Sequence, residues 1–200
     1  RAARAEAGFA LEEGKNALIR NCTLPYNNVD NPSVSLYRFE SGGARGLTVW
    51  LGYKSEQPGA DMRMRTYLQA PPLSSFSDCQ GNILKMELQK TVARHYGAYL
   101  ATVHFAPPGL NTVYAVTAEP DIEKLWRRLG DGTVEFRLEE MPDTTVSRCI
   151  ALALPEGAEI LSISPEPDRR AAAGGNTMLV YSRYFPSNLA FTISARFRLP

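Results

Sequence analysis

The alternation of apolar and polar residues in the C-terminal part of this chain constrains its fold more than any other feature. From Phe191 to Leu199 every second residue is apolar, and the residues between them are Thr, Ser or Arg. Because successive side chains of a strand point to opposite faces, this period of two predicts a strand with one buried and one solvated face. Other stretches with a similar period are residues 34–39, 47–53, 62–68, 99–105, 113–117, 134–139, 144–154, 158–164 and 178–184.

Short Gly and Pro turns join most of these stretches. They predict antiparallel pairing, because a parallel pair needs a crossover of about a dozen residues or more. We therefore predict a single β-rich domain over residues 1–200, of the α+β class and predominantly antiparallel, with sandwich-like sheets of about nine strands and two or three helices. The strands after Asp143 are too few for a free-standing sandwich of ~7 strands, so they should form half of a larger one completed by earlier strands.

Two segments carry apolar residues at helical spacing. Residues 122–129 give the clearest helix pattern, with apolar residues at i, i+3, i+4 and i+7 and Gly130 at the end. Residues 82–96 show a similar spacing, yet Leu84–Leu88 also alternates as a strand would. For residues 82–96 we favour the helix, and the strand stays open as the alternative.

The N-terminal residues predict a further helix and bear on localisation. Residues 1–20 are rich in Ala and Glu, and we interpret residues 1–22 as a helical lead-in or an anchor-proximal segment. The sequence starts with Arg1 rather than Met, so we expect it to be cut from something longer. Asn21-Cys22-Thr23 is a glycosylation sequon. With the sandwich-like pattern, these features predict an extracytoplasmic location or processing after targeting.

The composition excludes several classes of protein. Apolar residues make up 44% of the chain and charged residues 22%, which rules out wholesale disorder. The formal net charge is +1, so no bulk field favours nucleic acid or an anionic membrane. No stretch holds the ~18 apolar residues that a membrane-spanning helix needs. Membrane contact would therefore come only through residues outside this chain.

Cysteine and histidine residues are too few and too widely spaced for a zinc motif. The cysteines are Cys22, Cys79 and Cys149, the histidines are His95 and His104, and none of them forms a close Cys or His pair. We predict no metal and no cofactor. The odd number of cysteines allows one disulfide with a free thiol, or three reduced thiols, and the sequence leaves both open.

No arrangement of residues predicts catalysis. Cys79 is the candidate for thiol chemistry because it falls in a predicted loop, although the neighbouring Asp78 would raise the pKa of its thiol. His104 lies within a predicted strand and His95 near a predicted helix end, where structural roles are expected. Glu139-Glu140 are adjacent, so their side chains point apart, and we interpret both as solvated.

Four arginines are the candidate ligand-binding residues. Arg63 and Arg65 fall at alternate positions of one predicted strand, and Arg196 and Arg198 do so in another. If the two strands are neighbours, the four guanidinium groups form one stripe that can pair carboxylates or phosphates. An ordinary charged outer face is the interpretation that we favour. Nearby aromatic residues are too few for a platform that stacks single-stranded nucleic acid.

Residues 144–154 combine an apolar face with a face of small residues. The small residues are Ser147, Cys149, Ala151 and Ala153, and they allow another layer to approach closely. Internal packing is the use that we favour, and a docking edge for a partner is the alternative.

Taken as a whole, the sequence predicts a non-catalytic binding or assembly module of a larger protein or complex that is extracytoplasmic or membrane-associated. We expect protein partners to bind through a sheet face or edge, and we find no strong nucleic-acid signal. The alternatives are a hydrolase that uses a Cys or carboxylate site, and a domain that binds an anionic glycan or nucleic acid.

Overall fold

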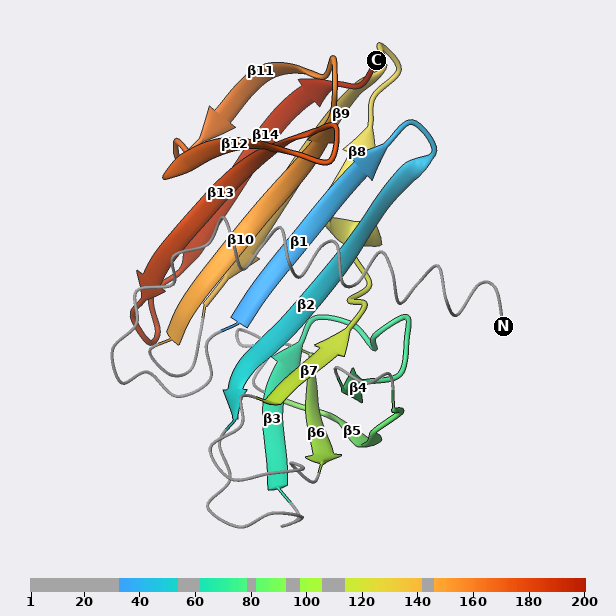
Figure 1. The fold of residues 1–200 in the computed structure, drawn as a ribbon, viewed down its shortest axis with the longest axis vertical. Helices are drawn as coiled ribbons and strands as arrows, with labels where there is room; N and C mark the ends of the chain where they lie inside the picture. The colour runs from blue at the N-terminus through green and yellow to red at the C-terminus, as the bar shows by residue number, and fades with distance from the viewer. Residues whose placement is uncertain (1–32, 54–61, 79–81, 93–97, 106–113, 142–145) are drawn as a thin grey trace.

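The strands of this chain are arranged in three sheets (Figure 1). The computed structural model describes residues 33–53, 62–78, 82–92, 98–105, 114–141 and 146–200. A seven-stranded sheet has the order β12-β13-β10-β1-β2-β7-β4, a four-stranded sheet the order β11-β14-β9-β8, and a three-stranded sheet the order β3-β6-β5.

The seven-stranded sheet contains β1 (Ser33–Glu40), β2 (Gly43–Tyr53), β4 (Ser77–Asp78), β7 (Tyr114–Ala118), β10 (Val146–Pro155), β12 (Arg169–Ala173) and β13 (Asn176–Phe185). The four-stranded sheet contains β8 (Trp126–Arg128), β9 (Thr133–Glu140), β11 (Glu159–Ser164) and β14 (Phe191–Arg198). The three-stranded sheet contains β3 (Met62–Leu68), β5 (Lys85–Lys90) and β6 (Tyr99–Phe105).

The predicted antiparallel β architecture is confirmed. Every strand pair that the structure describes is antiparallel except β1 with β10, which run parallel at the centre of the largest sheet. That pair joins residues more than a hundred positions apart, for example Ser33 with Arg148. The chain crosses to both other sheets between them, so this connection is far longer than a turn.

The seven-stranded and four-stranded sheets share one core. Phe39, Leu152 and Tyr181 come from the first sheet, and Phe136 and Phe197 from the second, and all five belong to one buried cluster. A second cluster joins Met64 and Val103 of the three-stranded sheet to Val116 of β7. The last five strands therefore contribute to two layers that earlier strands complete.

Strand β10 is buried on both faces. Ile150, Leu152 and Leu154 belong to the core between the two sheets, while Cys149 and its small neighbours belong to a separate buried cluster. Cys149, Ala151 and Ala153 are each at most 1% exposed. The small-residue face is therefore inside the chain, which agrees with internal packing and not with a free docking surface.

The predicted helices are the part of the fold prediction that was wrong, within the described residues. Residues 122–129 form a short 3-10 turn, Glu123–Leu125, followed at once by β8. Ile122 is buried, and Leu125 and Trp126 are partly buried against the same core. The predicted apolar residues therefore do face the core, but from a 3-10 turn and a strand instead of an α-helix. Pairing of β8 with β9 overrides the local helical spacing.

The strand alternative holds for the described part of residues 82–96. Lys85–Lys90 is β5, an edge strand paired with β6. Leu84 and Met86 pack against the core at a spacing of two, whereas Val92, which the helical pattern would bury, is 99% exposed. Residues 1–32, which include the third predicted helix, lie outside the described residues.

The structure has more strands than the sequence pattern indicated. It describes fourteen, including very short ones such as β4 and β8. Residues 165–175 contain β12 and end in Gly174 and Gly175, with φ values of 57° and 74°. Two consecutive residues with positive φ suit the tight turn of a β-hairpin, which explains the β12–β13 pair.

Gly46 in β2 is required by a close approach of the chain. A Cβ atom at this position would lie 2.8 Å from Ile122 Cγ2 and 2.9 Å from Pro120 Cγ. Gly46→Ala should therefore lower the free energy of unfolding by about 1–3 kcal/mol through overpacking. Urea denaturation measures this loss. Gly42→Ala is the matched control, because nothing lies within 4 Å of the Cβ that it would add, and an equal loss in both variants would contradict the explanation.

Candidate functional site

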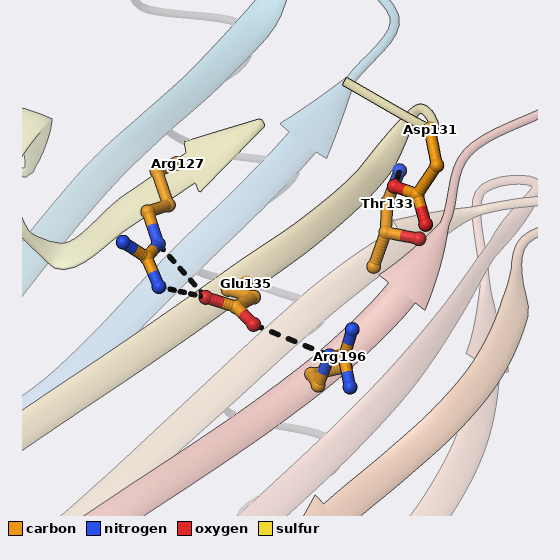
Figure 2. Close-up of polar contacts among 5 residues, drawn as sticks. All are labelled: Arg127, Asp131, Thr133, Glu135 and Arg196. Carbon is orange, nitrogen blue, oxygen red and sulfur yellow. Dashed lines mark hydrogen bonds and ion pairs between the residues drawn. The ribbon is translucent and has the colours of Figure 1, made fainter. Parts of the chain in front are cut away.

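The outer face of the four-stranded sheet carries a ladder of ion pairs. At its centre Glu135 of β9 lies between Arg127 of β8 and Arg196 of β14 (Figure 2). Arg127 Nε and Nη2 lie 2.8 Å and 2.6 Å from Glu135 Oε2, and Arg196 Nε lies 3.3 Å from Glu135 Oε1. Both carboxylate oxygens of Glu135 are therefore occupied by cations from neighbouring strands.

The ladder continues on both sides of Glu135. Arg198 Nη1 donates to Glu159 Oε2 of β11 at 2.8 Å, and Arg137 Nη2 lies 3.2 Å from Glu139 Oε2. The arginines of this face are paired with the chain's own carboxylates, so an external anion would have to displace them. The side chains are half exposed or more at Arg196 and Arg198, which limits the energy of each pair.

The turn that leads into β9 is held by Asp131 (Figure 2). The backbone N–H of Thr133 donates to Asp131 Oδ1 at 2.9 Å. This hydrogen bond from the backbone of Thr133 is the main reason that the pKa of the Asp131 carboxyl is lowered below its usual value. Asp131 therefore stabilises the turn that precedes the strand carrying Glu135.

The outer face of the three-stranded sheet is different. Arg63 and Arg65 of β3 are exposed, while Met64 between them is 2% exposed and faces the core. In the described part of the chain neither guanidinium makes an ion pair or hydrogen bond. We call Arg63 and Arg65 the free arginine pair.

Across the sheet from this pair, the carboxylate of Glu87 in β5 is contacted by Lys85 and His104. Lys85 Nζ and His104 Nε2 lie 3.2 Å and 3.3 Å from Glu87 Oε1. A hydrogen bond from Lys85, together with its charge and a smaller effect of His104, lowers the pKa of the Glu87 carboxyl. His104 is thus partly buried and bound to a carboxylate, which agrees with its predicted structural role.

The four candidate arginines do not form one stripe by strand pairing. β3 pairs with β6 in the three-stranded sheet, and β14 lies between β11 and β9 in the four-stranded sheet. The condition that the two strands are neighbours is therefore not met. One pair of arginines is free and the other is neutralised within its own sheet.

A polar cluster between the two main sheets was missed by the sequence analysis. Glu140 of β9 and Arg148 of β10 form an ion pair across the layers, with side chains 20% and 24% exposed. Glu140 was predicted to be solvated, and that prediction was wrong. In both strands the charged residue falls two positions from a core residue, on the same face as the apolar ones. A charged residue at such a position was the sequence signal that could have indicated this cluster.

Tyr37 belongs to the same cluster. Burial raises the pKa of its hydroxyl, and the charge of Arg148 and a hydrogen bond with Ser35 partly offset that effect. Burial also lowers the pKa of Arg148. Ser35 Oγ in turn lies 3.1 Å from Thr48 Oγ1. The cluster therefore connects the two layers, and the Tyr37 hydroxyl stays neutral at ordinary pH. Arg148 Nε is buried without a hydrogen-bond partner among the described residues.

The described cysteine and histidine residues do not make a nucleophilic site. Cys149 is disulfide-bonded and 0% exposed, so it has no free thiol. Cys79 and His95 lie outside the described residues. Within those residues, no three His, Cys, Asp or Glu side chains are grouped as metal ligands would be, and no helix has the length and hydropathy to cross a membrane.

Comparison with known proteins shows the fold alone. No family model and no curated protein matches the sequence. Among solved structures, native leukotriene A4 hydrolase from Saccharomyces cerevisiae matches with a TM-score of 0.47 and 10% identity, over 89% of this chain and 32% of that one. The yeast enzyme in complex with bestatin matches with a TM-score of 0.50 and 9% identity, over 88% and 31%. This chain thus spans about a third of the structures it matches.

Proposed function

We propose that this chain is a non-catalytic binding or assembly module of a larger protein. The observation that carries the proposal is that charged side chains on the sheet surface pair with one another. On the four-stranded sheet, charged side chains pair with each other across neighbouring strands, as in the Arg127–Glu135–Arg196 set and in Arg198–Glu159. Such pairs order a sheet surface, whereas catalysis needs a nucleophile, an acid or a base that is free to react.

The fold comparison is in keeping with this proposal. In the bestatin complex of yeast leukotriene A4 hydrolase the matching part covers 31% of the chain, so this fold occurs there as one portion of a longer protein. At 9% identity the likeness gives no reason to transfer the hydrolase activity.

We further propose that the parent protein lies outside the cytosol, with membrane association through residues beyond this chain. Cys149 is disulfide-bonded in the middle of the largest sheet, and structural disulfides persist mainly in oxidising compartments. Labelling of free thiols in intact cells before lysis tests this proposal. We expect Cys149 to stay unlabelled both in the cells and after mild denaturation without reductant, and labelling of Cys149 under either condition would count against the proposal.

An activity screen tests the non-catalytic proposal against the hydrolase alternative. The purified chain would be incubated with peptide, ester, glycoside and phosphoester substrates, alongside Cys79→Ala and a sample alkylated at its thiols. We expect no turnover above the buffer blank in any of the three. Turnover that Cys79→Ala or alkylation abolishes would establish the hydrolase alternative instead.

A further inference from the structure

The free arginine pair lies on a strand at the edge of its sheet. In the order β3-β6-β5, strand β3 pairs with β6 on one side over residues 62–68. An edge strand presents backbone N–H and C=O groups on its other side, where a further strand can add. β3 has seven residues, which is enough to pair with a segment of ordinary strand length.

The charge beside this edge is positive and uncompensated. Arg63 and Arg65 are exposed on one face, about 7 Å apart because alternate residues of a strand are separated by twice ~3.4 Å. Glu87 is the one acidic residue in the three strands of this sheet, and it lies on the opposite edge strand. Lys85 and His104 already bind Glu87, so it does not neutralise the pair.

The spacing of the pair matches an extended peptide. A strand added beside β3 would place every second side chain on the face of Arg63 and Arg65, at the same repeat of about 7 Å. Carboxylates at alternate positions of that strand would then lie opposite or diagonal to the two guanidinium groups. Guanidinium and carboxylate groups form charge-assisted hydrogen bonds, which are stronger than neutral ones.

We propose that the edge of β3 binds an extended acidic segment of a protein partner, by strand addition, with alternate carboxylates paired to Arg63 and Arg65. This inference rests on the proposed function, because it names the class of partner that the module binds. A peptide fits better than a nucleic acid, since the face offers two free cations beside a strand edge on which no other described strand pairs, and the whole chain carries a net charge of +1.

Fluorescence anisotropy with synthetic peptides tests the proposal. The probe is a labelled ten-residue peptide in which Glu alternates with Val or Thr, measured in low salt against the folded chain. We expect saturable binding that weakens at least tenfold when Arg63→Gln and Arg65→Gln are combined. The matched control combines Arg196→Gln and Arg198→Gln, which removes two exposed arginines from another sheet and should leave the affinity within twofold.

Four further probes test the parts played by strand addition and by charge attraction. An added strand donates hydrogen bonds from every second backbone N–H. Methylation of those nitrogens in the same peptide should therefore abolish binding. A peptide with Gln in place of every Glu should also fail to bind. A peptide with all its Glu residues contiguous should bind more weakly. Equal binding of the contiguous peptide, or tighter binding of a single-stranded oligonucleotide of the same charge, would overturn the proposal.

A charge exchange provides a readout that misfolding cannot imitate. Arg63→Glu combined with Arg65→Glu should reject the acidic peptide and bind the corresponding peptide in which Lys alternates with Val or Thr. Failure of every peptide to bind the wild-type chain would overturn this inference and leave the non-catalytic proposal standing. Turnover in the activity screen would overturn that proposal independently.

Discussion

Phe136→Ala should lower the free energy of unfolding by about 3–5 kcal/mol, the largest loss that we expect from one substitution in this chain. Phe136 is 2% exposed in β9. Its ring centroid lies 5.3 Å from that of Tyr37 and 5.5 Å from that of Phe39, both in β1 of the facing sheet. Removing the ring leaves a cavity between the two layers, which the surrounding strands can fill only in part. Urea denaturation measures the loss.

Arg137→Ala is the control for this substitution. Arg137 follows Phe136 in the same strand, but its side chain is 68% exposed and, among the described residues, pairs only with Glu139. An exposed ion pair of this kind contributes about 0–1 kcal/mol. The loss in free energy of unfolding should therefore be several-fold smaller for Arg137→Ala than for Phe136→Ala. A loss below about 1 kcal/mol for Phe136→Ala would mean that the two sheets do not depend on a shared core.

Reduction of the Cys149 disulfide should have the second-largest effect. Cys149 lies in β10, between β13 and β1, and is 0% exposed. Loss of a native disulfide costs about 2–5 kcal/mol, chiefly because the unfolded chain gains freedom. We expect the urea midpoint of the wild-type chain to fall when dithiothreitol is included in the denaturation series, since the buried bond becomes accessible only on unfolding.

Cys149→Ala gives the comparison for the reduction experiment. Ala151 and Ala153 lie on the same face of β10, so an alanine at position 149 suits the packing there. This variant should show one urea midpoint with and without dithiothreitol, close to that of the reduced wild-type chain. A wild-type midpoint that dithiothreitol leaves unchanged would show that the bond does not stabilise the fold.

Strand positions and their buried faces could be predicted from the sequence because the period of two is a local property. In β14 the alternating residues Ile193, Ala195 and Phe197 are buried, and Arg196 and Arg198 are exposed, as the pattern indicated. The same holds for the apolar residues of β9. Successive side chains of a strand point to opposite faces because of the backbone geometry alone. The buried face of a strand can therefore be predicted without knowing which distant residues it contacts.

The sheet order and the local structure of residues 122–129 could not be predicted in the same way. The spacing of Ile122, Leu125 and Trp126 is compatible with a helix, but a 3-10 turn followed by a strand also turns them toward the core. The choice depends on β9, which lies later in the chain and offers an edge to β8. Likewise, nothing local shows that β3 and β14 belong to different sheets, which decides whether their arginines meet.

The parallel pairing of β1 with β10 has a consequence for how the chain is made. Strand β1 forms the middle of the largest sheet only after residues 146–155 have left the ribosome, because one of its two neighbours is β10. Contacts between such distant segments slow folding, whereas the three-stranded sheet draws all its strands from residues 62–105 and can assemble earlier. A nascent polypeptide halted at about residue 140 would therefore contain a folded three-stranded sheet and a strand β1 that is not yet paired with β10.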